Sequence, residues 1–280
     1  MDIKAGRGML ILRQARTAEE IAACQRLRYR VFYEEMNAKA DEKTSALMMD
    51  CDRFDAICDH LLVVHLGQPK HDSPIMIADG ELIGTYRLLS QKTAEAHGGF
   101  YTQSEFDIAP LVARHPGLQF LELGRSCVLK PFRTKPVVEL LWQGIWNYVR
   151  ACRMDVMLGC ASLEGTDPDA HALALSFLAE AAAPPEWTVR ALPGRLVNMR
   201  RMPPEKIDKR RALAVLPPLI KGYLRLGCYI GDGAVIDEQF NTIDVLIILP
   251  VSAINPRYFA HFGQPQDDIL QAPPGYRLIS

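Results

Sequence analysis

Apolar and polar positions alternate with two different periods along the chain, and the changes of period divide it into strands and helices. An apolar run at residues 9–13 predicts a strand, and a helical period follows from a capping box at Thr17–Glu20 to about Met36. Asp79-Gly80 has the composition of a hairpin turn. Three short apolar or alternating runs around it predict an antiparallel meander, at residues 61–66, 75–78 and 82–89.

The second half of the chain alternates strand and helix before a closing pair of strands. Strands are predicted at 120–128, 155–159, 228–236 and 242–251, and helices at 134–152, 167–182 and 217–226. This order predicts an α/β fold with a mixed central sheet flanked by helices, in a single domain over residues 1–280. Residues 184–216 are rich in proline and basic residues and are expected to form an insertion, and residues 264–280 a tail.

Composition excludes several classes of protein. The chain has 280 residues, 32 of them basic and 33 acidic, so no overall field attracts it to nucleic acid. No apolar run approaches the roughly 20 residues of a membrane span, and the amino-terminal run is too short for a signal peptide. The expected location is therefore cytoplasmic, with peripheral binding at the inner membrane left open. Seven cysteines without close CxxC pairs suit a reducing compartment.

A basic turn stands where the strand at 120–128 leads into the next helix. Lys130, Arg133 and Lys135 surround the start of this helix, where backbone N–H groups and the helix dipole favour an anion, so they are candidate phosphate ligands. The spacing resembles the Arg-x-x-Gly-x-Gly loop of acetyltransferases, but Pro136 and Val138 replace both glycines. This favours the single phosphate of a carrier-protein arm over the pyrophosphate of coenzyme A. A solvated basic turn is the alternative.

The same strand carries two candidate catalytic residues, Glu122 and Arg125. Residues three apart in a regular strand face opposite sides, so the two can meet one site only across a β-bulge, for which Gly124 is a natural position. Glu122 is then a candidate general base, because an amine must lose a proton when it attacks a thioester. A surface salt bridge is the alternative.

An acidic loop and two distant arginines form a further candidate site. Asp50, Asp52 and Asp55, with Arg28 upstream and Arg87 on a later strand, can hold an ammonium group or grip a carboxylate. A solvated acidic loop is the alternative. The loop lacks an EF-hand pattern, and the cysteines and histidines lack zinc spacing, so no metal ligand is assigned.

Basic residues also gather inside the expected insertion. Between residues 195 and 211, seven basic residues stand against Glu205 and Asp208, which gives 7 − 2 = +5 and leaves −6 for the rest of the chain. Such a patch can dock an acidic carrier protein or anionic lipid headgroups, and a solvated loop is the alternative. The seven are Arg195, Arg200, Arg201, Lys206, Lys209, Arg210 and Arg211.

Several of these motifs follow one another in the order found in acyl-homoserine-lactone synthases. That resemblance implies the GNAT acyltransferase fold and an acyl carrier protein as the acyl donor. The tryptophan that those synthases carry after the Val-Phe pair is absent, with Met36 and Asn37 in its place, which counts against lactone synthesis. The motifs are Leu27–Phe32, Asp50–Asp55, Gly84–Leu89 and Glu122–Arg125.

A longer resemblance, from about residue 10 to 263, is to the L-ornithine Nα-acyltransferases that form ornithine lipids. It implies transfer of a 3-hydroxyacyl group from acyl carrier protein to the α-amine of ornithine, giving a lyso-ornithine lipid at the inner membrane. The segments that carry it are Glu122–Arg133, Cys160–Asp167, Pro217–Gly227, Asp237–Asp244 and Asn255–Tyr258.

The reaction expected from these residues is direct attack of the amine on the thioester. Glu122 takes the proton, strand N–H groups steady the oxyanion, and no bound cofactor is required beyond the phosphopantetheine thioester. Two alternatives remain open: autoinducer synthesis, which consumes S-adenosylmethionine, and an inactive module that binds lipid or carrier protein.

Overall fold

Ten strands form one sheet in the part of the chain that this computed structural model describes, residues 4–69, 72–181 and 183–258. Their order is β1-β2-β3-β5-β6-β7-β10-β9-β8, with β4 paired to β5 off this path. The pair β6 and β7 is parallel and the other strand pairs are antiparallel, so the predicted mixed sheet is confirmed. The strands are β1 (Lys4–Arg7), β2 (Leu10–Gln14), β3 (Asp59–His65), β4 (Met76–Ile77), β5 (Gly80–Ser90), β6 (Phe120–Val128), β7 (Val156–Glu164), β8 (Leu196–Val197), β9 (Tyr229–Asp237) and β10 (Thr242–Pro250).

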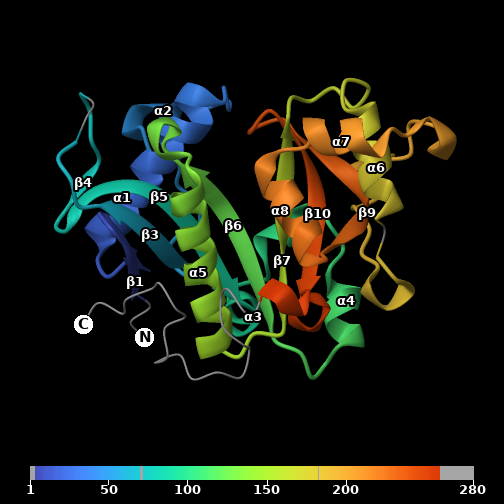
Figure 1. Cartoon of the computed structure of the whole chain (residues 1–280), viewed down its shortest axis with the longest axis horizontal. Coiled ribbons are helices and arrows are strands. Elements are labelled where there is room, and N and C mark those ends of the chain that lie inside the picture. Colours follow the sequence, from blue (N-terminus) through green and yellow to red (C-terminus); the bar gives the residue numbers. More distant parts are fainter. Residues whose placement is uncertain (1–3, 70–71, 182, 259–280) are drawn as a thin grey trace.

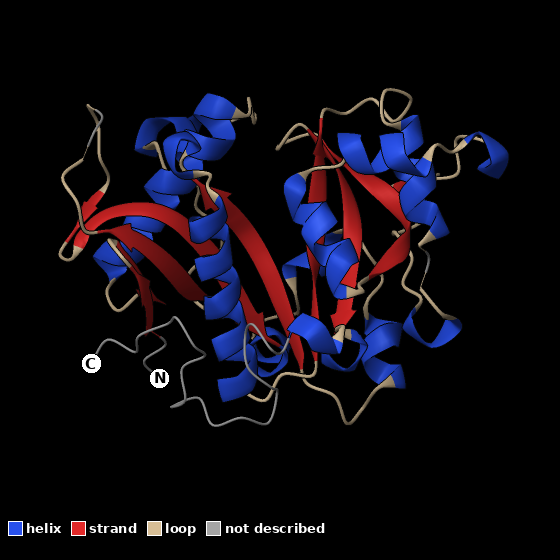
Figure 2. Cartoon of the chain, in the orientation of Figure 1, coloured by secondary structure: helices blue, strands red, loops and turns tan. Residues whose placement is uncertain are grey.

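Helices flank this sheet, and their apolar sides fill two clusters of buried residues (Figures 1 and 2). The larger cluster takes side chains from α1, α5, α6 and α8, and the smaller one from α3 and α4. No helix among the described residues is long and apolar enough to cross a bilayer. The helices are α1 (Ala18–Tyr29), α2 (Glu42–Leu47), α3 (Gln91–Ala96), α4 (Ala109–Arg114), α5 (Lys135–Ala151), α6 (Ala172–Glu180), α7 (Lys209–Val215) and α8 (Pro218–Leu226).

Helix α1 begins where the sequence predicts, but only one of the two hydrogen bonds of the predicted capping box is formed. The Thr17 hydroxyl accepts the Glu20 N–H at 3.3 Å, as a capping residue does. The Glu20 carboxylate accepts the Arg16 N–H at 2.7 Å and pairs with the side chain of Arg13, so the reciprocal bond of a capping box is replaced. Beyond Tyr29 the helix continues as a π-helical turn to Glu35, which accounts for the predicted length.

One predicted boundary is wrong, and the segment predicted as an insertion contains regular structure. The helix expected from Asp167 begins only at Ala172, because the Asp167 carboxylate accepts the Asp169 N–H at 2.9 Å and holds a turn there. The segment 184–216 carries regular structure of its own, since β8 pairs with β9 at the sheet edge and α7 packs on α6. The expected tail at 264–280 lies outside the described residues.

The sheet divides where β6 and β7 separate. Their registered pairs are Phe120 with Val156, Leu121 with Met157 and Glu122 with Leu158, although both strands continue for six residues more. A Cβ atom on Gly159 would lie 2.2 Å from the Leu123 carbonyl oxygen, so this close approach requires glycine. Figures 1 and 2 show the two strands together at one end and diverging toward the end that carries α2 and α7. The divergence leaves the facing backbone edges of β6 and β7 without registered partners from each other.

A bulge in β6 lies just beyond this point. Thr85 pairs with Cys127 and Arg87 with Gly124, so β6 has one residue more than β5 in the same interval. Arg125 has a φ of +52°, a left-handed conformation that is uncommon for a residue with a side chain. The bulge predicted at Gly124 is therefore present, with the unusual backbone conformation on the next residue.

Candidate active site

Six of the residues selected from the sequence meet in one buried ion network. Arg28 on α1 contacts Asp50 at 2.7 Å and Asp55 at 2.8 Å. Arg87 on β5 contacts Asp52 at 2.7 Å and Asp55 at 3.1 Å. The members are Arg28, Asp50, Asp52, Asp55, Arg87 and Arg125, with three positive and three negative charges, so the network is neutral in itself.

Burial and charge act in opposite directions in this network. The Arg28 side chain is wholly buried, and removing an ion from water is costly unless it is paired. Burial by itself would raise the pKa of Asp55. The guanidinium groups of Arg28 and Arg87 oppose this effect, and the net result is a pKa lowered to about 2. Asp55 is therefore ionised at neutral pH and committed to its arginines. All three aspartates form ion pairs with arginines of the network, and their contact with the substrate stays a prediction.

Arg125 differs from the other two arginines because it lies at the edge of the network. Its contacts are longer, 3.2 Å to Asp50 and 3.3 Å to Asp52, and its guanidinium lies 4.6 Å from the ring centroid of Tyr101 and 4.5 Å from that of Phe240. The left-handed backbone at the bulge brings this side chain to the same loop as Arg28. Arg125 is thus the arginine whose carboxylate partners are least tightly held.

Glu122 stands where β6 and β7 separate. Its two carboxylate oxygens accept the backbone N–H groups of Tyr101 at 2.9 Å and Thr102 at 2.7 Å. Burial raises the pKa of this carboxyl, and the hydrogen bonds from Thr102 and Tyr101 oppose the rise. Glu122 therefore anchors the 3-10 turn Tyr101–Ser104 and is not in the surface salt bridge considered as its alternative. Its role as a base remains a prediction.

The basic turn lies at the far end of β6, as the sequence predicts, and is solvent-exposed. Arg133 donates to the Val128 carbonyl at 2.9 Å and pairs with Glu35 at 2.5 Å, and Lys135 pairs with Glu139 at 3.4 Å. The N–H of Val137 already donates to the Thr134 carbonyl, and Pro136 has none. This helix start therefore offers an anion mostly side-chain charge, with few backbone N–H groups.

A second cluster, which the sequence analysis missed, joins β7 and β10 to the turn beside Glu122. The donor atoms of Glu105, Cys160 and Asp244 lie within 4.8 Å of one another, close enough to hold a cation, including a metal ion. The Cys160 thiol donates to the Glu105 carboxylate at 3.2 Å, and Arg195 approaches the same carboxylate at 3.6 Å. These three residues are far apart in the sequence, so only the folded sheet brings them together.

The carboxyl groups of this cluster hold their protons more strongly than usual. Burial, together with the charge of Asp244, raises the pKa of Glu105 to about 7. Burial also raises the pKa of Asp244, and the charge of Arg125 acts to lower it. The ion network and the cluster of Glu105, Cys160 and Asp244 therefore interact. A cation placed between Glu105 and Asp244 would draw both into the ionised state.

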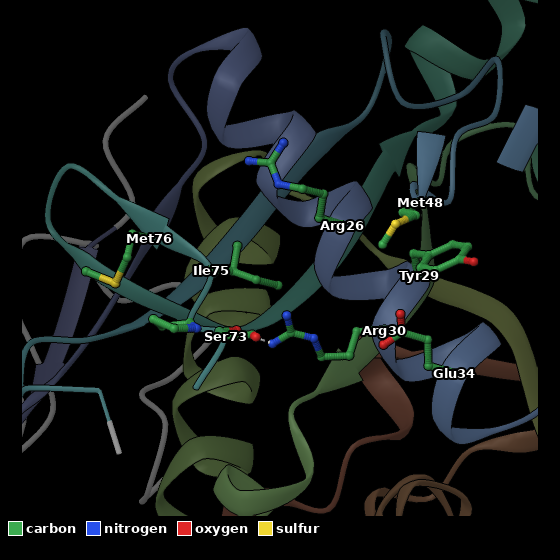
Figure 3. A pocket seen from close by; sticks show the side chains of 9 residues that line it. Arg26, Tyr29, Arg30, Glu34, Met48, Ser73, Ile75 and Met76 are labelled. Carbon is green, nitrogen blue, oxygen red and sulfur yellow. Dashed lines mark hydrogen bonds between the residues drawn. The ribbon is translucent and has the colours of Figure 1, made fainter. Parts of the chain in front are cut away.

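A cavity of about 240 Å³ lies outside this region, on the outer side of α1 (Figure 3). Arg26 of α1 and Arg30 of the following π-helical turn line it with Met48, Ile75 and Met76, and Arg30 donates to the Ser73 carbonyl at 2.7 Å. Residues two apart on a helix face nearly opposite sides, so Arg28 points away from the cavity into the ion network. None of the predicted site residues lines it.

Comparison with known proteins gives several extended matches. The acetyltransferase (GNAT) domain family matches residues 27–143. L-ornithine N(alpha)-acyltransferase of Agrobacterium fabrum is 53% identical over 257 residues, covering 91% of this chain and 86% of that protein. The enzyme of the same name from Rhizobium meliloti is 52% identical over 252 residues, covering 90% and 83%, and that from Rhodobacter capsulatus 36% identical over 247 residues, covering 88% and 92%.

Solved structures resemble the chain at much lower identity. FeeM, an N-acyl amino acid synthase from uncultured soil microbes, has 13% identity and a TM-score of 0.49 over 89% of this chain and 97% of that chain. The acyl-homoserine-lactone synthase LasI has 11% identity and a TM-score of 0.44 over 89% and 93%. The family match over residues 27–143 confirms the GNAT fold expected from the sequence.

Arg28 provides the test of the ion network. In Arg28→Leu the carboxylates of Asp50 and Asp55 lose their main partner inside the protein, and we expect the free energy of unfolding in urea to fall by about 3–5 kcal/mol. Lys39→Ala removes the exposed pair with Glu238 and should cost less than about 1 kcal/mol. A stable Arg28→Leu protein with only a raised Michaelis constant for the acceptor would assign Arg28 to substrate binding instead.

Glu105 predicts an unusual dependence of stability on pH. Folding raises the pKa of Glu105. Its contribution to the free energy of unfolding is therefore fully present below the unfolded pKa of about 4.5 and is lost as pH rises through about 7. Glu105→Gln removes the titrating group and so removes this loss. The unfolding free energy of the variant minus that of the wild type should therefore rise by about 2–3 kcal/mol from pH 5 to pH 8. The exposed Glu186→Gln is the control, and parallel pH profiles for all three proteins would contradict the assignment.

Proposed function

Because the chain belongs to the family of L-ornithine N(alpha)-acyltransferases, we propose that it transfers a 3-hydroxyacyl group from acyl carrier protein to the α-amine of ornithine. The product is then a lyso-ornithine lipid. The observation that carries this proposal is the separation of β6 and β7 beside Glu122, because it opens a backbone edge between a buried carboxylate and a basic turn. An extended thioester-bearing arm can lie along such an edge and pair with it as an added strand does.

The choice of donor rests on the basic turn at the start of α5. Lys130, Arg133 and Lys135 supply charge, but Pro136 lacks an N–H and Val137 uses its own within the helix. A pyrophosphate is bound through several backbone N–H groups at glycine-rich loops, which this turn does not provide. A single phosphodiester needs fewer contacts, and this favours the prosthetic arm of acyl carrier protein over coenzyme A.

The choice of acceptor rests on two charged groups near Tyr101, which are the ion network and the cluster of Glu105, Cys160 and Asp244. Ornithine carries a carboxylate and two ammonium groups. Arg125, the least tightly paired arginine of the network, can bind the carboxylate, while Glu105 and Asp244 bind the side-chain ammonium. This placement leaves the α-amine free to face β6 near Glu122.

The transfer itself needs no covalent enzyme intermediate. The α-amine nitrogen attacks the thioester carbonyl and the C–N bond forms. The C–S bond then breaks, and the thiolate of the arm leaves as a thiol with the proton that Glu122 accepted from the nitrogen. Glu122 takes the amine proton, since each oxygen that accepts an N–H keeps a further lone pair and burial raises its pKa. Backbone N–H groups of β6 beyond the separation stabilise the oxyanion.

The function is tested by supplying donors and acceptors separately. We expect product with 3-hydroxyacyl-acyl carrier protein and ornithine, and catalytic efficiency at least tenfold lower with the same acyl chain on coenzyme A. Equal or better rates with coenzyme A would contradict the donor assignment. An assay with S-adenosylmethionine as the only acceptor tests autoinducer synthesis. If no pair of donor and acceptor gives a product, the remaining interpretation is an inactive module that binds lipid or carrier protein.

Glu122→Gln tests the general base. Turnover should fall about 100- to 10,000-fold, while binding of acyl carrier protein remains, and the residual rate should rise with pH as more amine loses its proton unaided. Unfolding in urea is measured beside it, because the Gln amide cannot accept both N–H groups of Tyr101 and Thr102. Full activity at neutral pH excludes the role, and a loss of both binding and cooperative unfolding makes Glu122 structural.

The acceptor assignment is tested with norvaline, which has the same carbon chain as ornithine without the terminal amine. Asp244→Asn should lower catalytic efficiency for ornithine at least tenfold and leave that for norvaline unchanged, because only ornithine presents an ammonium to the cluster. Ser162→Ala, which removes a hydrogen bond to the same carboxylate, is the control for packing. An equal loss with both acceptors would show that Asp244 acts on folding or on the donor.

A further inference from the structure

Two short helices expose apolar side chains at the same end of the molecule. On α7, Leu213 is 42% and Val215 58% exposed, and Ala214 between them is also exposed. On the other side of the diverging strands, α2 ends in Leu47, 49% exposed, followed by Met48, 53% exposed. Figure 1 shows α2 and α7 at the edge toward which β6 and β7 diverge. Runs of three exposed apolar residues are uncommon on soluble surfaces and point to a binding function.

The way each helix is held shows that these side chains are not part of the core. Helix α7 packs through Ala212, which is wholly buried, and is followed by the buried Leu216. Helix α2 has no buried residue, although the carboxylate of Asp41 caps it by accepting the Thr44 N–H at 2.7 Å. A helix this short is marginal in water by itself. Both apolar tips are therefore available to a partner outside the chain.

The charges beside α7 indicate what kind of partner it is. Of the seven basic residues between 195 and 211, four form ion pairs within the protein: Arg195 with Glu105, Arg200 with Asp232, Arg201 with Asp169 and Lys209 with Glu180. Lys206, Arg210 and Arg211 have no ion pair among the described residues and are exposed. Unpaired cations next to exposed Leu and Val suit an anionic interface with an apolar interior.

We propose that the tips of α2 and α7, residues 46–48 and 210–215, seat the protein on the surface of an anionic lipid bilayer. The apolar side chains enter the boundary of the acyl chains, and Arg210 and Arg211 contact headgroup phosphates. An acidic carrier protein would use the cations but has no need of four large apolar residues on two separate helices, so the bilayer is favoured. The contact does not depend on the proposed acyl transfer, although a lipid product would leave the protein toward this edge.

Vesicle flotation tests the surface, with the full chain and no substrates. We expect binding to phosphatidylcholine vesicles containing 30% phosphatidylglycerol and at least tenfold weaker binding to phosphatidylcholine alone. Leu213→Ser with Val215→Ser, and separately Leu47→Ser with Met48→Ser, should each lower partitioning at least tenfold. Met9→Ser with Leu66→Ser removes exposed apolar side chains that lie outside both helices and outside the cavity lined by Met48, and this variant should bind as the wild type does. Arg210→Gln with Arg211→Gln should weaken binding to the anionic vesicles alone.

Failure of this proposal can be told from failure of the enzymatic one. All the substituted side chains are exposed, so unchanged thermal unfolding midpoints are expected and checked first. Wild-type protein that does not float with anionic vesicles, or α2 and α7 variants that float as the control does, would overturn the bilayer contact. Variants that float normally but show a raised Michaelis constant for acyl carrier protein without vesicles would make this surface a carrier-protein site. Turnover measured without vesicles reports on the acyl transfer separately.

Discussion

Neutralisation of two buried arginines and one partly buried arginine by three aspartates is the constraint on which the rest of the site depends. The network ties α1, the loop at 50–55, β5 and β6 together, although these segments are distant in the sequence. A buried charge is tolerated only when it is paired, so none of these segments can move away alone. Arg125 joins this network from a bulge with a left-handed backbone, and the bulge is thereby fixed beside the separation of β6 and β7.

The two charged groups of the site differ in a way that suits different tasks. The ion network is closed and its carboxylates are already ionised, as the lowered pKa of Asp55 indicates, so it is a rigid support. The cluster of Glu105, Cys160 and Asp244 has raised pKa values and lacks a full complement of positive charge. Such a cluster gains most from a cationic ligand. Glu122 lies between them, held by backbone N–H groups of the turn that also carries Tyr101.

The sequence predicted most strands and the long helix α5 because their apolar periods are unambiguous, and Gly227 ends α8 in the left-handed conformation expected of a helix-ending glycine. It missed α2, whose exposed apolar residues follow no core-facing period, and placed the start of α6 too early because Asp167 caps a turn. The residues of the ion network were selected from sequence motifs. That these arginines and aspartates pair with one another was not predicted, since the distances between them depend on the fold. The cluster of Glu105 and Asp244 had no local signal, because β10 meets β7 only in the folded sheet.

We propose that the reacting thioester lies where β6 and β7 separate, and photocrosslinking tests this most directly. Acyl carrier protein would carry a stable amide analogue of the thioester, with a diazirine on the acyl carbon next to the carbonyl. We expect labelling of peptides that contain residues 122–128 of β6 and 159–164 of β7, and protection of both by excess unlabelled acyl carrier protein. Labelling confined elsewhere, such as the cavity lined by Arg26, Met48 and Met76, would contradict it.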